Sequence, residues 1–440
     1  MISQFLNPTV IAVIGAAREE NKIGNIIFKN LVSNPHLKVF PVNPNADKIL
    51  GKKCFKDVLE IPYNIDLAVI CVKAEIAPKI LEQISRKNIK NAIIIAAGFS
   101  ESKNYELENK IKQIAEDNKI QILGPNVMGL ISVNNKINAS FFNGIPKPGS
   151  IAFLSQSGAL GSAILDYAIK NEIGMSGFVS LGNMINTDFS DFIEYYNKDP
   201  ETKVIAVYLE SLKQEKGKRF IEVCKNSSKP IVVLKAGSSE KGIRAAVSHT
   251  AALASEQGVY EGIFKQCNLI QTSSLRELFD ISDTCQKLNN IKTKLERACI
   301  ITNAGGPGVL LVDYLEKNKI QVPEIPKKTF SKLNSILSSQ WSHNNPIDIA
   351  GDALADRYYN ALKILETEDW FDFFIVILTP QYMTQVIETA NLLINLKKPV
   401  FACFMGGKQV ELGIHFLKRK NIPVFNELSD LADVLGKIKR

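Results

Sequence analysis

The segment Ile151-Ala-Phe-Leu-Ser-Gln-Ser-Gly-Ala-Leu-Gly161 decides the fold, because a similar segment occurs a second time at Ala298–Gly308. Its apolar run, tight polar turn and following small residues predict a strand that leads into a helix. Ile151–Ile173 can be laid on Ala298–Ile320 without a gap, and Lys229–Gly237 resembles Lys398–Gly406. The repeat is far longer than a solenoid period. We therefore expect an internal duplication of a flavodoxin-like α/β unit.

The residues before this duplication alternate short β-branched runs with helical stretches. Such alternation predicts a Rossmann-like, doubly wound parallel sheet with its ligand at the carboxyl ends of the strands. The expected strands are Val10–Ile14, Lys38–Val42, Leu67–Val72, Ala92–Ala96 and Gln121–Leu123, and the expected helices are Ile23–Val32, Ala77–Arg86 and Tyr105–Glu116.

Two polar stretches divide the 440 residues. Asn143–Gly149 is rich in Pro and Gly, and Gln286–Arg297 is rich in Lys. A chain of this length holds roughly three domains of ordinary size. We predict a Rossmann-like first domain over residues 1–130, a flavodoxin-like domain over 145–288 and a second flavodoxin-like domain over 296–440.

The strand ends of the first domain indicate the class of ligand. The turn Ile14–Gly24 is suited to phosphate but lacks a complete G-x-G-x-x-G, and the second strand ends Phe40-Pro-Val-Asn-Pro44. No acidic residue stands there to hold a ribose 2′-hydroxyl, which disfavours a nicotinamide-dependent oxidoreductase. The pattern favours another adenine nucleotide. Ala97–Glu101 and Gly124–Gly129 place further small residues where an extended ligand could run.

Composition excludes several other classes. A net charge of +8 on scattered lysines gives no case for nucleic acid, and no apolar run is long enough to span a membrane. The seven cysteines form no C-x-x-C pair, which indicates free thiols in a reducing cytoplasm. No pair among His36, His343 and His415 has metal-ligand spacing, so we expect no metal site and read them as structural or surface residues.

The two copies differ where chemistry is expected. Each offers the start of a helix, at Gly158 and Gly305, as an anion site. The loop Lys235–Ala254 of the first copy carries His249, which has no counterpart in the second copy, and Glu210 is replaced there by Thr379. His249 is either a surface residue or a nucleophile for a phosphoryl group held between the two helix starts. In the second case Glu210 would fix the tautomer of the imidazole.

Five motifs resemble one family. They are Gly-Pro-Asn-Val-Met-Gly (124–129), Ser-Gln-Ser-Gly-Ala-Leu-Gly (155–161), Val-Ser-Leu-Gly-Asn (179–183), Ser-His-Thr-Ala-Ala-Leu-Ala (248–254) and Thr-Asn-Ala-Gly-Gly-Pro-Gly-Val (302–309). Together they resemble the nucleoside-diphosphate-forming acyl-CoA synthetases, relatives of succinyl-CoA synthetase, and among these the α subunits of ADP-forming acetate–CoA ligases. The resemblance covers the whole chain and keeps the domain order of that family.

The resemblance implies an acid–thiol ligase. Phosphate attacks acyl-CoA to give acyl phosphate and CoA, the phosphoryl group passes to a histidine, and ADP then becomes ATP. It implies that His249 is the phosphohistidine, with Glu210 as its support. The implied phosphate-binding residues are Ser155, Gln156, Ser157, Gly158, Asn303, Gly305 and Gly306. The implied CoA contacts are Gly15, Ala16, Ala17, Arg18, Asn43, Pro44, Val72, Lys73, Ala97, Gly98 and Phe99.

The same resemblance implies a partner. The ATP-grasp half that binds ADP or ATP is absent from these residues, so we expect a separate β subunit in an α2β2 assembly, with Mg2+ and the nucleotide mainly on that subunit. A small carboxylic acid and phosphate are the expected substrates beside CoA. The alternative interpretation is a non-catalytic, CoA-binding regulatory protein of the same fold.

Overall fold

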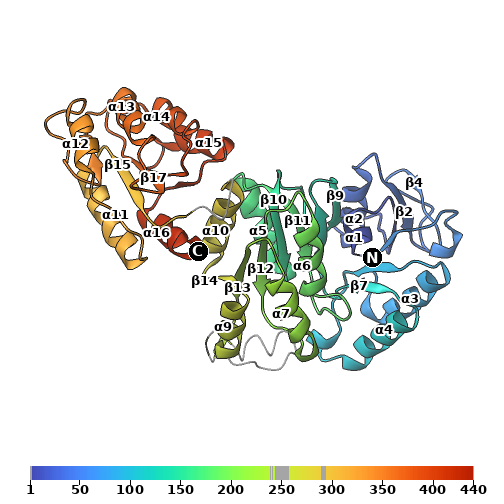
Figure 1. Cartoon of the computed structure of the whole chain (residues 1–440). Helices are drawn as coiled ribbons and strands as arrows, with labels where there is room; N and C mark the ends of the chain where they lie inside the picture. Colours follow the sequence, from blue (N-terminus) through green and yellow to red (C-terminus); the bar gives the residue numbers. More distant parts are fainter. Residues whose placement is uncertain (1, 238, 240, 243–256, 289–293, 440) are drawn as a thin grey trace. The chain divides into compact units, whose positions relative to one another are not determined.

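The computed structural model describes residues 2–439, except for 238, 240, 243–256 and 289–293 (Figure 1). The chain divides into two compact units, Met1–Leu278 and Phe279–Arg440, which are described separately below. Each unit is built on mainly parallel β-sheet with helices against it. The predicted α/β fold class is confirmed.

The first sheet of the first unit has five strands in the order β2-β1-β5-β6-β7, and all of its pairings are parallel. Its strands are β1 (Val10–Ile14), β2 (Lys38–Val42), β5 (Leu67–Ile70), β6 (Asn91–Ile94) and β7 (Gln121–Leu123). Its helices are α1 (Ser3–Leu6), α2 (Ile23–Val32), α3 (Ala77–Arg86) and α4 (Tyr105–Asp117). A small hairpin, β3 (Lys48–Ile49) and β4 (Lys52–Lys53), follows β2.

The order of these strands contains a topological switch point. β2 lies on one side of β1, and β5, which is the next strand of this sheet in the chain, lies on the other side. At such a point the two connections diverge and leave a crevice at the carboxyl ends of the strands. The first ligand site is therefore expected where β1 and β5 end.

The second sheet has seven strands in the order β14-β13-β12-β10-β11-β8-β9. Its strands are β8 (Gly129–Ser132), β9 (Ile137–Ser140), β10 (Pro148–Ser155), β11 (Met175–Ser180), β12 (Val204–Leu209), β13 (Ile231–Lys235) and β14 (Ile270–Thr272). Its helices are α5 (Gly158–Lys170), α6 (Phe189–Lys198), α7 (Gly217–Lys225) and α9 (Gln257–Gln266), and α10 (Leu275–Lys287) crosses from the first unit into the second. The hairpin β8–β9 pairs antiparallel with β11, in a stretch to which the sequence analysis gave no element. All eight residues of its two strands are buried, although Ile137–Ser140 alternates apolar and polar residues.

The sheet of the second unit has the order β16-β15-β17-β18-β19 and is parallel throughout. Its strands are β15 (Ala298–Thr302), β16 (Ile347–Asp348), β17 (Phe373–Leu378), β18 (Val400–Phe404) and β19 (Val424–Phe425). Its helices are α11 (Gly305–Lys317), α12 (Lys327–Asn334), α13 (Ala355–Leu365), α14 (Val386–Leu393), α15 (Glu411–Arg419) and α16 (Leu428–Ile438). In Figure 1, α13, α14 and α15 lie beside one another in this unit, as their packing contacts require.

The duplication is visible in local hydrogen bonds. In the first copy the side chain of Asn171 donates to the carbonyl oxygen of Tyr167 at 2.9 Å and so ends α5. In the second copy Asn318 donates to Tyr314 at 3.0 Å and ends α11 in the same way. The helices begin at Gly158 and Gly305 and have equal lengths. The strands β14-β13-β12-β10-β11 of the first unit thus follow the same order as β19-β18-β17-β15-β16 of the second, and α5 and α11 end in the same way.

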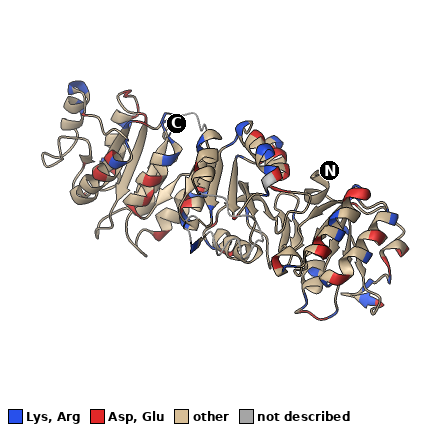
Figure 2. Ribbon diagram, turned by 90° about the horizontal axis from the view of Figure 1, so that it is seen from below, with Lys and Arg blue, Asp and Glu red and all other residues tan. Residues whose placement is uncertain are grey.

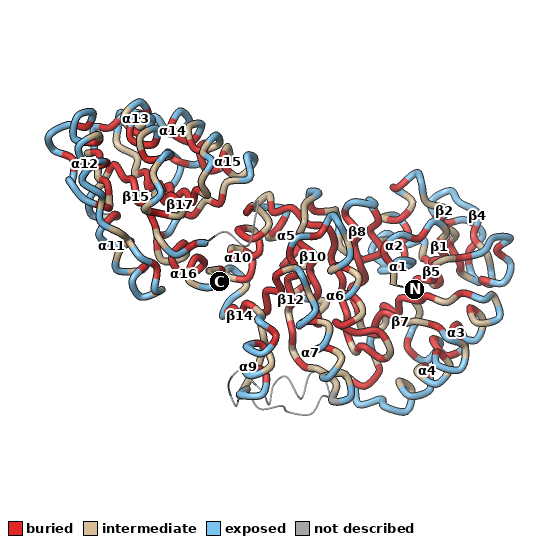
Figure 3. Tube along the Cα trace, in the orientation of Figure 1, coloured by how far each residue is buried: buried red, intermediate tan, exposed pale blue. Residues whose placement is uncertain are grey.

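Burial follows the sheets. Figure 3 shows the strands buried and the outer faces of the helices exposed, and the strands supply most of the apolar core. Figure 2 shows Lys and Arg interspersed with Asp and Glu. No helix among the described residues is both long and apolar enough to cross a membrane.

Candidate functional site at the carboxyl ends of the strands

The predicted CoA contacts of the first turn lie at the switch point. Gly15 follows β1 with a φ of +86°, a conformation that favours glycine. A Cβ at Gly15 would lie 2.9 Å from Cγ1 of Val72, which follows β5. The turn is held from behind by α2, where Asn25 donates to the carbonyl oxygen of Ala17 at 2.8 Å. The ends of β1 and β5 thus meet as the prediction requires.

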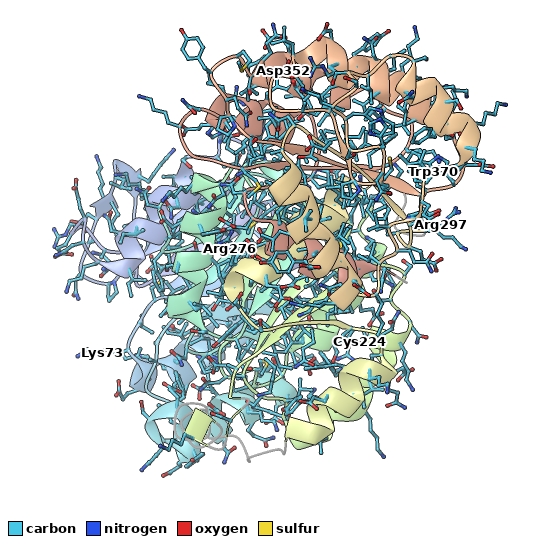
Figure 4. The ribbon with its side chains drawn as sticks, turned by 90° about the vertical axis from the view of Figure 1, so that its left-hand side faces the viewer. Lys73, Cys224, Arg276, Arg297, Asp352 and Trp370 are labelled. Atoms are coloured by element: carbon cyan, nitrogen blue, oxygen red, sulfur yellow. The ribbon has the colours of Figure 1, made fainter. Side chains whose placement is uncertain are left out.

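The residues after β2 join the same edge. The side chain of Asn43 donates to the carbonyl oxygen of Ala16 at 2.8 Å and fixes the two turns to each other. Arg18 is exposed and reaches the carbonyl oxygen of Asn45 at 3.4 Å. Lys73 is exposed after β5, and Figure 4 shows it at the surface of the first unit. Two cations therefore stand near the carboxyl ends of these strands, an arrangement suited to a ligand with several phosphates.

The third predicted segment, Ala97–Phe99, is shaped by a carboxylate. Oε1 of Glu101 accepts hydrogen bonds from the backbone N–H groups of Gly98 at 2.6 Å and Phe99 at 3.1 Å. Its Oε2 accepts from the side chain of Asn183, which lies in the turn after β11, at 2.6 Å. Burial raises the pKa of Glu101, but these hydrogen bonds outweigh it and hold the pKa below its usual value. Glu101 therefore joins the first predicted ligand site to the Val179–Asn183 motif.

The predicted phosphate turn of the first copy begins α5. Ser155 is fully buried and donates through Oγ to the carbonyl oxygen of Ser157 at 2.8 Å. The Oγ of Ser157 caps the helix by accepting from the N–H of Leu160 at 3.3 Å. A Cβ at Gly158 would lie 3.3 Å from the main-chain nitrogen of Met128. The start of α5 therefore lies close to the motif 124–129 and is aligned by its dipole for an anion.

Gln156 joins this turn to the candidate support residue. Its Oε1 accepts from the main-chain N–H groups of Glu210 at 3.0 Å and Ser211 at 2.9 Å. Its Nε2 donates to the Oγ of Ser211 at 3.2 Å. Because the side-chain amide of Gln156 is buried and used in these bonds, it positions the turn and is not left to bind a phosphate. The structure thus brings the turn of residues 155–158 beside Glu210.

The sequence analysis missed a lysine and a tyrosine near Glu210. Lys235 ends β13 beside β12, and its Nζ lies 4.6 Å from the ring centre of Tyr260. The hydroxyl of Tyr260 accepts from the N–H of Leu212 at 3.0 Å. Burial lowers the pKa of Lys235, and the charge of Glu210 opposes that shift. The signal was present in the sequence, because Phe404 occupies the position of Lys235 in the second copy.

His249 lies outside the described residues, and its predicted role stays a prediction. The other histidines have local contacts. The ring of His343 lies 4.7 Å from that of Trp341, and Nε2 of His415 lies 3.8 Å from a carboxylate oxygen of Glu411. His36 is exposed in a loop. Among the described residues no group of three or more His, Cys, Asp or Glu could hold a metal ion.

The turn of the second copy lies in the second unit and differs in charge. The buried side chain of Asn303 donates to the carbonyl oxygen of Thr379 at 2.9 Å and accepts from its N–H at 2.9 Å. A Cβ at Gly305 would lie 3.0 Å from Oδ2 of Asp348, whereas nothing lies within 4 Å of a Cβ at Gly306. A carboxylate beside this helix start weakens the prediction that it holds phosphate. The roles of Asn303, Gly305 and Gly306 therefore stay predictions.

Three of the five motifs converge in the first unit. The N–H of Met128 donates to Oγ of Ser180 at 3.1 Å, and Asn183 donates through its N–H to the carbonyl oxygen of Pro125 at 3.0 Å. Leu181 donates in the same way to Ser155 at 2.8 Å. Motifs that are far apart in the chain are thus in contact where β10 and β11 end. These contacts bring three of the motifs together beside the predicted anion site at the start of α5.

Sequence comparisons identify each part. Residues 9–132 match the family described as CoA binding domain, 148–285 the succinyl-CoA ligase like flavodoxin domain, and 298–437 the Ligase-CoA domain. The chain is 37% identical over 444 residues to "Acetate--CoA ligase [ADP-forming] II subunit alpha" of Pyrococcus furiosus, covering 98% of this chain and 96% of the relative. The chain therefore belongs to the nucleoside-diphosphate-forming acyl-CoA synthetase family.

Further comparisons concern length and fold. "Acetate--CoA ligase [ADP-forming] I" of Archaeoglobus fulgidus is 40% identical over 96% of this chain, which spans only 61% of that relative. The dinucleotide forming acetyl-coenzyme A synthetase 1 of Ca. Korarchaeum cryptofilum, solved with phosphate and ADP, has a TM-score of 0.93 at 32% identity. That comparison covers 100% of this chain and 96% of the solved one.

Proposed function

We propose that this chain is the α subunit of an ADP-forming acyl-CoA synthetase of the acetate–CoA ligase type. The observation that carries the proposal is the contact between the start of α5 and Glu210 through Gln156. It sets the start of a helix, our predicted anion site, next to a carboxylate in a chain that is 37% identical to a named α subunit along its length. The CoA site is formed by the ends of β1, β2, β5 and β6.

The reaction proceeds in three reversible transfers. Phosphate attacks the thioester carbon of acyl-CoA, the C–S bond breaks, and acyl phosphate and CoA form. The imidazole of His249 then takes the phosphoryl group, and the carboxylic acid leaves as its anion. Phosphohistidine finally passes the group to ADP and gives ATP. Backbone N–H groups at the start of α5 stabilise the phosphoryl oxygens, and Glu210 stabilises positive charge on the imidazole.

The nucleotide step is assigned to a partner. This chain spans 61% of the Archaeoglobus relative, whereas it spans 96% of the Pyrococcus α subunit. We propose that an ATP-grasp β subunit holds ADP or ATP with Mg2+, and that two copies of each subunit assemble as α2β2 in the cytoplasm. Acetate or another small carboxylic acid is the product that accompanies CoA.

The decisive experiment follows the phosphoryl group. The chain is incubated with its ATP-grasp partner, Mg2+ and ATP labelled at the γ-phosphate, and the acid-labile, base-stable label is mapped by peptide analysis. We expect label on His249, and none in a His249→Ala chain. A His249→Ala chain that still makes ATP from acyl-CoA at the parent's rate would overturn the proposal.

Ligand binding separates the alternatives at lower cost. A ligand that binds the folded chain raises its thermal midpoint. We expect CoA to raise the midpoint and NAD to leave it unchanged. A shift with CoA in a chain that never forms phosphohistidine would favour the non-catalytic regulatory protein. A panel of carboxylic acids in the forward reaction then identifies the acyl group.

A further inference from the structure

The tyrosine that the sequence analysis missed contacts two strand ends of the first unit. Tyr260 lies near the start of α9 and is 5% exposed (Figure 1). Its ring centre lies 4.6 Å from Nζ of Lys235, the last residue of β13. Its hydroxyl oxygen accepts from the N–H of Leu212, in the turn that follows β12, at 3.0 Å. Because β12 and β13 are neighbours in the sheet, one side chain joins both ends.

Three successive backbone N–H groups after β12 are bound by side chains. Oε1 of Gln156 accepts from the N–H groups of Glu210 and Ser211, and the hydroxyl of Tyr260 accepts from that of Leu212. One acceptor comes from the turn before α5 and the other from α9. A buried N–H group without an acceptor is costly, so these two side chains fix the course of the turn. Tyr260 thereby completes the support of the backbone that presents Glu210.

The second copy provides a comparison for this place in the fold. The helices α9 and α15 each end two residues before an asparagine with positive φ, Asn268 at +53° and Asn421 at +58°. Counted back from these asparagines, Tyr260 corresponds to Gly413. The position of Lys235 is held by Phe404, the last residue of β18. A lysine and a tyrosine in the first copy thus correspond to a phenylalanine and a glycine in the second.

The second copy fills this space with a ring from the strand. Phe404 is fully buried, and a Cβ at Gly413 would lie 3.1 Å from Cε2 of its ring. The ring therefore packs against the backbone of α15. In the first copy the ring of Tyr260 comes from the helix, and the strand position carries the ammonium group of Lys235. Since one aromatic ring fills the space in both copies, packing does not explain the lysine or the hydroxyl. Both occur in the copy that carries Glu210.

The ring of Tyr260 compensates a charge that the fold partly buries. Burial lowers the pKa of Lys235, and the charge of Glu210 opposes that shift. The face of an aromatic ring attracts a cation. Lys235 also donates through Nζ to the carbonyl oxygen of Ala236. These contacts hold the ammonium group at the end of β13, next to the strand end that carries Glu210.

We infer that Tyr260 is a positioning residue for phosphoryl transfer, an inference that rests on the proposed function. Its ring holds the ammonium group of Lys235, and its hydroxyl holds the turn that carries Glu210. In the transfer the N–P bond to the imidazole forms, the P–O bond to the acyl group breaks, and the carboxylate leaves. The ammonium group stabilises the charge on the phosphoryl oxygens, and Glu210 stabilises the charge on the imidazole. Tyr260 sets the places of both.

Two phosphoryl donors separate this role from a structural one. The chain with its ATP-grasp partner and Mg2+ receives either acetyl-CoA with labelled phosphate or ATP labelled at the γ-phosphate. In the proposed function the first donor reacts beside Glu210 and the second on the partner. With the first donor we expect Tyr260→Phe to form phosphohistidine about 10-fold more slowly and Tyr260→Leu about 100-fold, since small misplacements slow transfer this much. With ATP both variants should keep the parent's rate.

Two further variants serve as controls. Phe371→Leu removes a buried ring that lies 4.7 Å from Nζ of Lys398, in the second unit. It should lower the urea midpoint as Tyr260→Leu does and keep the parent's rate with both donors. The double variant Lys235→Phe with Tyr260→Gly gives the first copy the packing of the second, and it answers the question if Tyr260→Leu does not fold. It should form phosphohistidine at the parent's rate with ATP and much more slowly with acetyl-CoA and phosphate.

The outcomes are distinct. If the parent forms no phosphohistidine with either donor, the proposed function fails. If the parent forms it and the Tyr260 variants match the parent with acetyl-CoA and phosphate, Tyr260 does not position the site. If the variants lose the same factor with both donors, Tyr260 is a packing residue, and the inference is overturned.

Discussion

The side-chain oxygen of Gln156 lies 3.0 Å from the main-chain nitrogen of Glu210 and accepts its hydrogen. In the second copy Asn303 makes the equivalent bond with Thr379 at 2.9 Å. A buried amide after the first strand thus fixes the end of the neighbouring strand in both copies. Because the bond is common to both, it belongs to the fold, and the first copy uses the fixed strand end to present Glu210.

Removal of this amide should affect both stability and chemistry. In Gln156→Ala the N–H groups of Glu210 and Ser211 lose their acceptor, which costs about 1–3 kcal/mol for each buried group left unpaired. We expect a lower urea midpoint and at least about 10-fold less phosphohistidine per minute, since misplacement of a supporting group slows transfer. Asn303→Ala should show the stability loss as well. Parent-like behaviour of Gln156→Ala in both assays would contradict the positioning role.

Lys235 offers a second test near Glu210. Its ammonium group lies over the ring of Tyr260, and only the first copy has a lysine here. A cation beside a transferring phosphoryl group stabilises the charge that develops on its oxygens. We expect Lys235→Met to lower the rate of phosphohistidine formation by about 10–100-fold, with stability at pH 7 nearly unchanged.

The pH dependence of stability isolates the same residue. Burial lowers the pKa of Lys235 in the folded chain below its ordinary value of 10.5. Between the two pKa values the unfolded chain therefore binds more protons than the folded chain. The free energy of unfolding consequently increases as pH rises through that window. The folded parent should gain stability there relative to Lys235→Met, as measured by urea unfolding up to pH 10.5. An identical pH profile for the two chains would contradict the buried ammonium.

Lys229 is the matched control for this substitution. It stands before β13, at the other end of the strand, and its Nζ donates to the carbonyl oxygens of Tyr196 and Asp199. Lys398 donates to the carbonyl oxygen of Phe371 in the second copy, which makes the bond a feature of the fold. Lys229→Met should lower stability and leave the rate of phosphohistidine formation close to the parent's.

Glu101 should control CoA binding. Glu101→Gln replaces one carboxylate oxygen by an NH2 group, which cannot accept a hydrogen bond. At least one of the bonds that Glu101 accepts, from Asn183 or from the backbone N–H groups of Gly98 and Phe99, is therefore lost. We expect CoA to bind about 10-fold more weakly in calorimetry. The hydrogen bonds lower the pKa of Glu101 despite its burial, so its contribution is complete above the unfolded value near 4.3 and falls as pH drops through the folded value. Glu106→Gln, on the exposed start of α4, should bind CoA like the parent.

The fold was largely predictable from local patterns. The bounds of β1, β2, β7, α2 and α3 agree with the predicted ranges, because each is a short apolar run or an amphipathic stretch between turn residues. The duplication was readable because both copies keep glycine at the start of the helix, at Gly158 and Gly305. The hairpin β8–β9 was missed, because β8 and β9 are only four residues long and the alternation of apolar and polar residues is confined to β9.

The site was predictable only in part. Small residues at strand ends identified the CoA edge and the start of α5, because a parallel sheet brings all its carboxyl ends to one side. The contacts of Glu101 with Asn183 and of Gln156 with Glu210 depend on pairings across 82 and 54 residues. Sequence spacing alone does not fix such contacts. The carboxylate of Asp348 beside Gly305 was missed for the same reason.

Gly24 provides the sharpest test of the CoA edge. An added Cβ would lie 2.1 Å from the carbonyl oxygen of Gly15 and 3.2 Å from Cα of Ala16, which are backbone atoms that cannot turn away. Alanine is favoured over glycine in a helix by about 1 kcal/mol, but a contact this short must displace the first turn. We expect Gly24→Ala to weaken CoA binding by at least about 10-fold. Gly262→Ala in α9, where nothing lies within 4 Å of the added Cβ, should keep CoA affinity and stabilise the chain slightly. CoA affinity equal to the parent's in Gly24→Ala would show that the turn after β1 does not hold the ligand.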